Sequence, residues 1–479
     1  MWLGAAKLWF LVSSYAITIA LTHLLTADVY GSYYAIARLV AVPNMVIIYT
    51  VLFSVSRPLA AQYDQGCPDF AGIRARGLRL ALVLGVPACA VVLLAAPWLA
   101  RWLADPSLTR PLQVVAPISL VYAVYAVNLG TLNAVRRFRR QAALDMAMAG
   151  SKAALIIGAA AAGLGLDATV GGFTLASVLA LLLSRALVGG VAPRPVGAAP
   201  AGASMAGFAG QLIVFTAVTN LLQSADVLLL KSHAANEAQA SAVGHYASAQ
   251  QIALVPYSLM NAVALLAFPL IAALDQQQTA KVRLYVSQTA KVTLVLLAFM
   301  SAVGSACARE IQALLFPKAY GAVASELRLL VWGFSGYSFA VTTAWILNSA
   351  KRPRAAVLLV AVPLAVVVVA ASVLVPGSFT TGAAWAVAAA GVAAAIVAMV
   401  VLRASFGAAV SLLQLGRIAL CVAAVEAVAW LWPTTATGGL LGKLAILAKL
   451  VVLAVVFVAA ALGSRAVTLT ELRGLRRGR

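Results

Sequence analysis

Long hydrophobic runs, separated by short polar or basic segments, follow one another along the whole chain. A helix of about 20 apolar residues crosses the roughly 30 Å hydrocarbon layer of a membrane. A run as long as 33–63 requires tilt, or a bend at a proline such as Pro43. The pattern therefore predicts an all-α integral membrane protein with about fourteen transmembrane helices, at 5–26, 33–63, 77–104, 110–134, 141–165, 168–191, 205–231, 240–274, 282–308, 323–350, 354–376, 380–405, 414–433 and 440–463.

The composition excludes a separate soluble domain of appreciable size. Hydrophobic residues make up 63% of the 479 residues and charged residues only 10%, whereas about a quarter of a soluble domain is charged. The first run follows Met1 closely and has no small-residue cleavage site, which favours an uncleaved first span over a signal peptide. The four cysteines and three histidines are scattered, so the sequence predicts neither a metal site nor a disulfide framework, and no cofactor.

The net charge of +21 is explained by membrane topology better than by a nucleic-acid partner. With the N-terminus placed in the cytoplasm, 21 of the 34 Lys and Arg residues lie in cytoplasmic loops or the tail and seven in outer loops. Such a bias in short loops orients membrane proteins. We therefore expect a multi-pass protein of a bacterial inner membrane with both termini cytoplasmic, its basic tail lying on anionic lipid.

Two pairs of similar segments indicate an internal duplication. "GSYYAIARLVAVP" (31–43) resembles "GHYASAQQIALVP" (244–256), and "LNAVRRFR" (132–139) resembles "LNSAKRPR" (347–354) at nearly the same offset. A unit of six spans enters the membrane in the same direction each time, which predicts two lobes related by a pseudo-twofold axis along the membrane normal. The expected domains are an N-lobe at 1–195, a C-lobe at 196–405, and two further spans with a basic tail at 406–479.

The repeated segments also resemble a known family. "LTADVYGSYYAIARLV" is similar to the second helix of the polysaccharide-export branch of the multidrug/oligosaccharidyl-lipid/polysaccharide (MOP) exporter superfamily. Residues 224–274, "REIQALLFPKAY" (309–320) and "LNSAKRPR" resemble later signatures of that branch, which includes the O-antigen flippases. The resemblance implies a flippase that exports an oligosaccharide repeat unit linked to a polyprenyl (undecaprenyl) diphosphate for surface polysaccharide assembly. Membrane lipids, a polysaccharide polymerase and chain-length machinery are the partners to expect.

Cations inside the predicted spans are the main candidates for binding the substrate. Ionisable residues are costly at membrane depth and are functional candidates by default. Arg38, Lys152 and Lys291 lie too deep for easy snorkelling to the headgroups. A cationic cleft attracts a diphosphate, and the planar guanidinium matches phosphate oxygens. Gln251, Asn220 and Gln223 are candidates for contacts to sugar hydroxyls, although such residues also join membrane helices.

Gating is expected to involve one carboxylate and two prolines. Asp226 has a depth similar to that of Arg38, so we predict an Arg38–Asp226 bridge in the outward-closed state, with a contact to Lys231 as the alternative for Asp226. Pro43 and Pro256 close the two copies of the repeat and are candidate bends. Coupling to protons or sodium stays open. In spans 13 and 14, Glu426 and Lys449 are expected to pair structurally.

Three other functions compete with export of surface polysaccharide. A lipid II flippase of the same superfamily also has fourteen spans and a cationic cavity. A cation-coupled multidrug exporter has intramembrane carboxylates, whereas this interior holds more cations than acids. A membrane glycosyltransferase or polymerase needs a large outer loop with paired catalytic residues, and the longest outer loops here are short. We therefore expect a transporter and no enzyme.

Overall fold

The described residues of this computed structural model are 2–63, 69–189, 205–260, 279–350, 352–407, 410–432 and 439–467, and they form α-helices with two short 3-10 turns. The chain divides into two compact units, Met1–Gly244 and His245–Arg479. The predicted start of the second lobe, residue 196, therefore lies inside unit 1. Compactness does not locate the start of a duplication, so the lobe boundaries stay a prediction.

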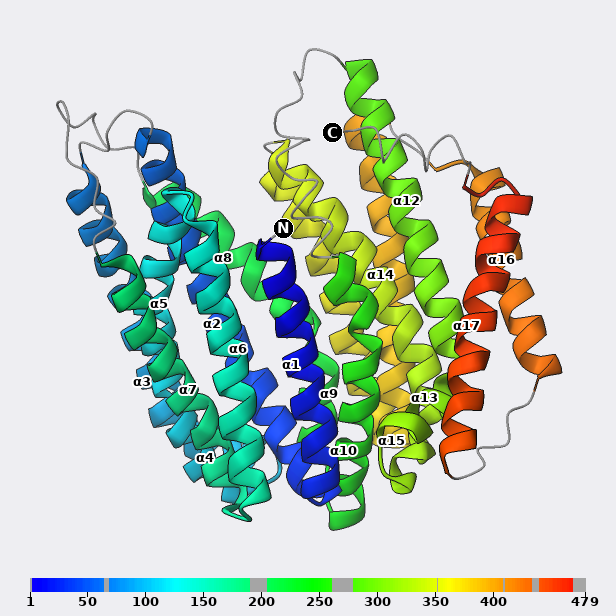
Figure 1. The fold of residues 1–479 in the computed structure, drawn as a ribbon, viewed down its shortest axis with the longest axis horizontal. Helices are drawn as coiled ribbons and strands as arrows, with labels where there is room; N and C mark the ends of the chain where they lie inside the picture. The colour runs from blue at the N-terminus through cyan, green and yellow to red at the C-terminus, as the bar shows by residue number, and fades with distance from the viewer. Residues whose placement is uncertain are drawn as a thin grey trace. The chain divides into compact units, whose positions relative to one another are not determined.

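The helices of unit 1 are α1 (Trp2–Leu24), α2 (Ala27–Tyr63), α3 (Phe70–Trp102), the turn η1 (Pro106–Leu108), α4 (Thr109–Val115), α5 (Pro117–Ala134), α6 (Phe138–Ala161), α7 (Gly165–Val188), α8 (Met205–Leu222), α9 (Ala225–Ser232) and the first part of α10 (Glu237–Ala253). Helices distant in sequence pack together: α1 packs against α6, and α2 against both α5 and α8 (Figure 1). Ile47, Val51 and Val55 recur one turn apart on α2 and form a core with α3 and α5.

Two aromatic contacts fix the register of α1 against α6. Near one end, the Arg139 guanidinium lies over the ring of Trp2, with 5.4 Å between Cζ and the ring centroid. Further along, Trp9 Nε1 donates to the carbonyl of Met146 at 3.1 Å. Both contacts join residues at the same distance along each helix, so α1 and α6 run parallel and in register.

The glycines that open the two repeat segments lie against one another. A Cβ atom built on Gly31 would come within 2.8 Å of the backbone nitrogen of Gly244, the last residue of unit 1. A Cβ atom on Gly244 would in turn overlap the carbonyl oxygen of Ala27. Small residues let membrane helices approach closely. The repeated glycine therefore permits the contact of α2 with α10.

Unit 2 contains the rest of α10, α12 (Thr279–Ala306), α13 (Ala308–Leu315), the turn η2 (Lys318–Val323), α14 (Ala324–Ser349), α15 (Pro353–Phe406), α16 (Leu412–Leu431) and α17 (Leu440–Gly463). α15 has 54 residues, about 80 Å at the rise of an α-helix and far more than a membrane thickness. Phe379, with φ of 42° and ψ of −112°, breaks it into two parts. These parts match the two spans predicted at 354–376 and 380–405.

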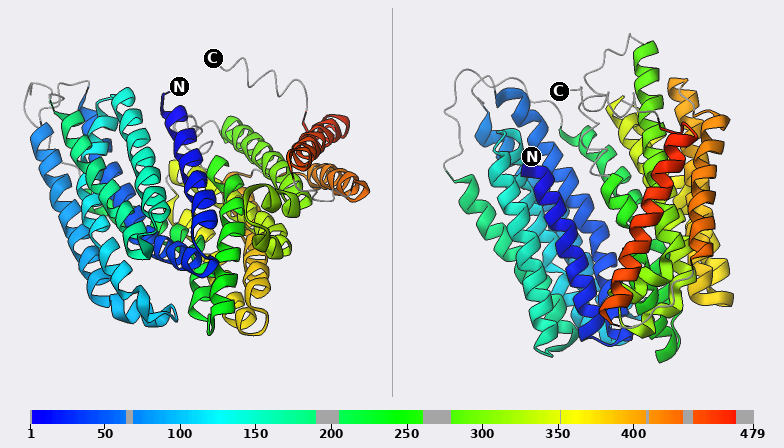
Figure 2. Two further views of the ribbon diagram at one scale, coloured as in Figure 1. Left: turned by 60° about the horizontal axis from the view of Figure 1, so that its bottom comes forward. Right: turned by 45° about the vertical axis from the view of Figure 1, so that its right-hand side comes forward.

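The last two helices of unit 2 pack on α12. They lie side by side in the two views of Figure 2 and contact each other and α12. Their shared core contains Ala302 and Cys307 from the α12–α13 region, Cys421 and Val425 from α16, and Phe457 from α17. Within unit 2 they therefore extend the hydrophobic core.

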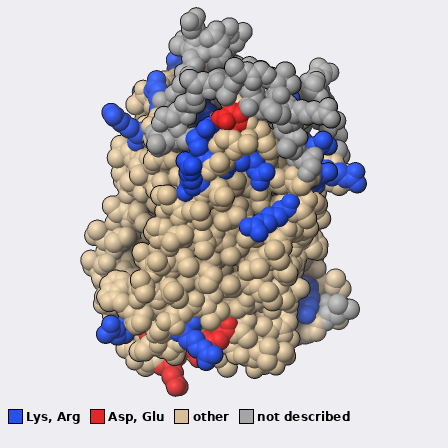
Figure 3. Space-filling view, turned by 90° about the vertical axis from the view of Figure 1, so that its left-hand side faces the viewer, with Lys and Arg blue, Asp and Glu red and all other residues tan. Residues whose placement is uncertain are grey.

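The chain is a multi-pass integral membrane protein. In the described part, eleven helices are long and apolar enough to span a membrane, and α8 with α9, bent by 54°, would make a twelfth. Residues 261–274 of the span predicted at 240–274 lie outside the described residues. Figure 3 shows Lys and Arg gathered toward the two ends of one face, with a broad band of uncharged residues between them. This band is the surface that a bilayer would cover.

Candidate functional site

A cation lies deep in α2 of unit 1. Arg38 donates from Nη2 to the hydroxyl of Tyr34, one turn earlier, at 2.5 Å. Its guanidinium carbon also lies 4.9 Å from the centroid of the Tyr34 ring. Tyr34 is buried and Arg38 half-buried. Because the i and i+4 side chains of a helix share one face, the α2 helix itself holds this pair.

A second cation, Lys152 on α6, lies close to the first. Its ammonium nitrogen is 3.8 Å from the centroid of the Phe173 ring on α7, a cation–π contact. Arg38 is near enough for its charge to repel that of Lys152. The sequence predicted both cations as parts of one site, and the structure brings them together within unit 1.

These groups occupy one level of the membrane. Counted from the helix ends that meet between α1 and α2 and between α6 and α7, Arg38 lies about 17 Å deep and Lys152 about 14 Å, at 1.5 Å per residue. Tyr15 on α1 is near enough to Arg38 to be affected by its charge. It lies about 14 Å from the same ends, and Phe173 lies about 12 Å from them. The layer is roughly 30 Å thick, so the four side chains lie near its middle.

The two cations, Arg38 and Lys152, make no salt bridge within the part of the chain that the structure describes. Their recorded contacts are a tyrosine hydroxyl and two aromatic rings. Two like charges held together in a low-dielectric region attract an anion strongly. We call Arg38, Lys152, Tyr34, Tyr15 and Phe173 the cationic cluster.

Asp226 lies at the edge of this cluster. It is fully buried in the first turn of α9, and its charge acts on Tyr34, as does that of Arg38. No direct Arg38–Asp226 ion pair occurs among the described residues. The predicted bridge belongs to an outward-closed state and stays a prediction.

The alternative partner of Asp226, Lys231, is bound elsewhere, so that expectation is wrong. Lys231 is buried, and its Nζ lies 3.4 Å from Asp105 Oδ2 and 3.1 Å from Ser32 Oγ. These contacts connect α9 with the start of α2 and with the segment between α3 and η1. Lys231 is therefore a structural contact between α9, α2 and the end of α3.

The other predicted substrate residues are more dispersed. Asn220 and Gln223 lie on or just after α8, and their amides donate to the carbonyls of Thr216 and Thr219 at 2.8 and 3.1 Å. Gln251 on α10 and Lys291 on α12 belong to unit 2. Their part in one site with the cationic cluster stays a prediction.

The two prolines behave differently. α2 continues as one helix through Pro43. α10 ends at Ala253, two residues after Gln251, which was expected to face the substrate. A turn follows at Leu254, and the chain is helical again from residue 255, next to Pro256. A proline lacks the N–H that would continue the helical hydrogen bonds. The chain thus interrupts its helix at the second copy only.

Sequence reasoning missed the aromatic side chains of the cluster. Tyr34 precedes Arg38 by four residues, a spacing that already places its ring beside the guanidinium. Tyr15 and Phe173 gave no such signal, because tyrosine and phenylalanine are ordinary in membrane helices. Another missed group is Asp145 on α6, which accepts from the Tyr125 hydroxyl at 3.4 Å and lies in the field of Lys7. In the described part of the chain, no group of three His, Cys, Asp or Glu residues could hold a metal ion.

Comparison with protein families adds a decisive match. The family described as "Polysaccharide biosynthesis protein" matches residues 78–325, more than half of the chain. The chain belongs to this family. The match covers parts of both units and agrees with the resemblance seen in the sequence. No curated protein sequence matches the chain.

Solved structures show the fold of the family member. The lipid II flippase MurJ in an inward closed conformation is similar over 99% of each chain, with a TM-score of 0.72 and 14% identity. An inward-facing multidrug resistance MATE family transporter of the MOP superfamily covers 83% of this chain and 94% of its own, with a TM-score of 0.66 and 14% identity. A MOP superfamily transporter from Pyrococcus furiosus covers 84% and 94%, with a TM-score of 0.59 and 15% identity. The protein has the fold of MOP-superfamily transporters.

Proposed function

We propose that this protein flips a polyprenyl-diphosphate-linked oligosaccharide across the bacterial inner membrane by alternating access, for assembly of a surface polysaccharide. The observation that carries the proposal is the cationic cluster. Arg38 and Lys152 lie at one depth, repel one another, and have no carboxylate partner among the described residues. A diphosphate supplies the missing negative charge.

Each residue of the cluster has a distinct part in this proposal. The Arg38 fork donates to phosphate oxygens in a planar arrangement, and the Lys152 ammonium acts as a compact point charge. Tyr34 orients the guanidinium through its hydroxyl. The Tyr15 hydroxyl, in the field of Arg38, is assigned to the first sugar. The polyprenyl tail stays in lipid throughout.

The full architecture is part of the same proposal. It consists of fourteen spans, two six-helix lobes related by a pseudo-twofold axis, an appended pair formed by α16 and α17, and both termini in the cytoplasm. The break of α15 at Phe379 and the bent pair α8 and α9 support the higher number of spans. A polysaccharide polymerase and chain-length machinery would act on the flipped product.

Export of the lipid-linked glycan in cells that lack the chromosomal copy tests the proposal. Arg38→Gln and Lys152→Gln should each lower export by at least tenfold, because a hydrogen bond to a charged group contributes about 1.5–3 kcal/mol. Arg38→Lys should retain more activity than Arg38→Gln. Arg101→Gln, a change of an exposed arginine at the end of α3, is the matched control. Normal export by a folded Arg38→Gln/Lys152→Gln double variant would refute the proposed role.

A lipid II flippase is the second candidate, favoured by one observation. The similarity to MurJ extends over 99% of both chains, whereas the MATE transporters leave about a sixth of this chain uncovered. Lipid II also carries a diphosphate, so the cluster fits both substrates. Depletion of the protein separates them: loss of viability indicates lipid II, and loss of surface glycan with normal growth indicates the polysaccharide unit.

A further inference from the structure

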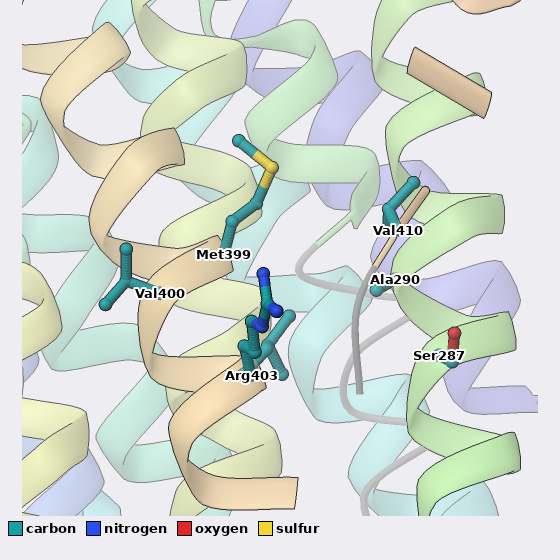
Figure 4. A pocket seen from close by; sticks show the side chains of 7 residues that line it. Ser287, Ala290, Met399, Val400, Arg403 and Val410 are labelled. Carbon is teal, nitrogen blue, oxygen red and sulfur yellow. The ribbon is translucent and has the colours of Figure 1, made fainter. Parts of the chain in front are cut away.

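A pocket lies in unit 2, whereas the cationic cluster belongs to unit 1. Figure 4 shows its side chains coming from two facing helices, α12 and α15, and from the segment after α15. Its lining is mostly apolar, with one charged and one hydroxyl side chain, and consists of Ser287, Ala290, Met399, Val400, Leu402, Arg403 and Val410. The predicted transport site uses none of these residues.

The two helices present matching stripes to this pocket. On α12, Ser287 and Ala290 line the pocket, and Arg283 lies one turn before Ser287 on the same face, outside the lining. On α15, Val400 and Arg403 line the pocket at helical spacing. α12 begins at Thr279 and α15 ends at Phe406. The arginine of each stripe is therefore near the helix end that the charge bias predicts to be cytoplasmic, and the apolar residues lie deeper.

Arg283 lies beside the same end of α15 as Arg403. Its Nε would be 3.7 Å from a Cβ atom built on Gly407, which is one turn beyond Arg403. Both arginines are exposed. A third, Arg352, already donates to the carbonyl of Ser405 at 2.8 Å and lies over the Phe406 ring. Two guanidinium groups thus flank the mouth of the pocket, and Arg352 secures the helix end behind them.

No carboxylate among the described residues of unit 2 lies near this end. The described acidic residues of unit 2 are Glu310, Glu326 and Glu426, all toward the opposite ends of their helices. Neither Arg283 nor Arg403 makes an ion pair among the described residues. The patch is therefore cationic at the headgroup level and apolar below it.

We propose that this pocket binds an anionic phospholipid, with its phosphate between Arg283 and Arg403 and an acyl chain along Ala290, Met399 and Val400. Basic pockets between helices on the cytoplasmic side are suited to anionic headgroups, and the inner leaflet supplies such lipids. The Ser287 hydroxyl donates to the phosphate or to the headgroup. The two arginines alone would also suit a small inorganic anion. The apolar inner part of the pocket suits an acyl chain and therefore favours a lipid.

Binding of phosphatidylglycerol to the purified full chain in phosphatidylcholine nanodiscs tests the site. Each of Arg283→Gln and Arg403→Gln should weaken phosphatidylglycerol binding about fivefold, and the double variant about 25-fold, from the roughly 1 kcal/mol that each basic residue contributes near a membrane surface. Ala290→Trp fills the apolar part of the pocket without a change of charge and should weaken phosphatidylglycerol binding about as much as one of the single arginine variants. Phosphatidylcholine should not compete.

Arg354→Gln is the matched control. Arg354 is exposed at the start of α15, which lies beside the end of α15 because Arg352 contacts Ser405, but it does not line the pocket. The variant should leave binding unchanged. If Arg354→Gln weakened phosphatidylglycerol binding as much as Arg403→Gln does, the binding would come from general surface charge, and the proposed site would be wrong. Full competition by millimolar inorganic phosphate, or unchanged binding by a folded Ala290→Trp variant, would overturn the lipid as occupant. Melting in pure phosphatidylcholine shows whether each variant is folded.

Discussion

Two lysines in different units, Lys152 half-buried and Lys449 buried, lie equally far from a helix end and have opposite surroundings. Lys152 lies nine residues from the end of α6 and Lys449 nine residues from the start of α17, about 14 Å in each case. Lys449 has a side chain that is 3% exposed and pairs with Glu310 Oε1 at 2.5 Å. Lys152 faces the Phe173 ring and is repelled by Arg38. The fold neutralises one lysine and leaves the other charged.

This contrast separates a structural charge from a binding charge. A buried ion pair satisfies both partners within the chain, and a ligand would have to break it to bind. Glu426 was predicted to pair with Lys449, but it accepts a hydrogen bond from Ser305 Oγ at 2.8 Å. Glu310, Lys449 and Glu426 all lie near Cys307, in the core shared by α12, α16 and α17. The Lys449 region thus stabilises the appended helices. Under the proposed function, the Lys152 region gains a neutralising charge when the diphosphate binds.

The largest expected effect is the loss of stability on breaking the buried pair. Lys449→Met leaves Glu310 as an uncompensated charge, which costs about 3–5 kcal/mol. Unfolding in detergent should therefore shift markedly toward the denatured state. The Lys449→Met/Glu310→Gln double variant should recover most of the loss, since neither partner is then charged. A double variant as unstable as the single one would contradict the structural role of the pair.

Lys152→Met is expected to leave the stability of the protein nearly unchanged but to lower export. Methionine packs well against an aromatic ring, and the change removes the repulsion with Arg38, so the free energy of unfolding should stay within about 1 kcal/mol of the wild type or rise. Export should fall by about 10–100-fold, because the diphosphate loses a charged donor. Paired unfolding and export measurements check both parts. A destabilised Lys152→Met protein with normal export would remove the distinction between the two lysines.

Much of the fold was predictable from hydrophobic runs. The runs located α1, α6, α7, α12, α14, α16 and α17 within about four residues, because each needs about 20 apolar residues to cross the membrane. They also located the ends of α2 and α3, but these helices begin at Ala27 and Phe70, before the predicted starts at 33 and 77. They also separated the two parts of α15 at the place where Phe379 has a positive φ. They did not reveal the 54° bend between α8 and α9, because an apolar run has the same composition whether straight or bent.

The site was only partly predictable for a different reason. Membrane depth follows from chain position, so Arg38 and Lys152 stood out as costly charges. The identity of their neighbours depends on helix packing, which a single sequence does not contain. Glu326 shows the same limit: it lies in the first turn of α14, yet it is 5% exposed and accepts from Ser325, Thr380 and Thr381. Hydroxyl donors from the break in α15 make that burial possible.

Giving Lys152 a partner should make it resemble Lys449. Phe173→Glu places a carboxylate where the ring now faces the ammonium group, so an internal pair can form. The substrate must then compete with this carboxylate, and export should fall about tenfold while the protein stays folded. Phe173→Leu, which keeps the site cationic, is the control and should cost less than threefold in export. Equal loss in the two variants would show that the ring matters more than the charge.

The smallest expected effect concerns the orientation of Arg38. Tyr34→Phe keeps the ring beneath the guanidinium but removes the hydroxyl that accepts its hydrogen bond. Such a bond contributes about 0.5–1.5 kcal/mol, so apparent substrate affinity should fall up to about tenfold with little change in the maximal rate of export. Tyr125→Phe, which removes the hydroxyl facing Asp145, is a matched control outside the cluster. If Tyr34→Phe lowered the maximal rate and left the affinity unchanged, Tyr34 would act in the conformational step and not in positioning the arginine.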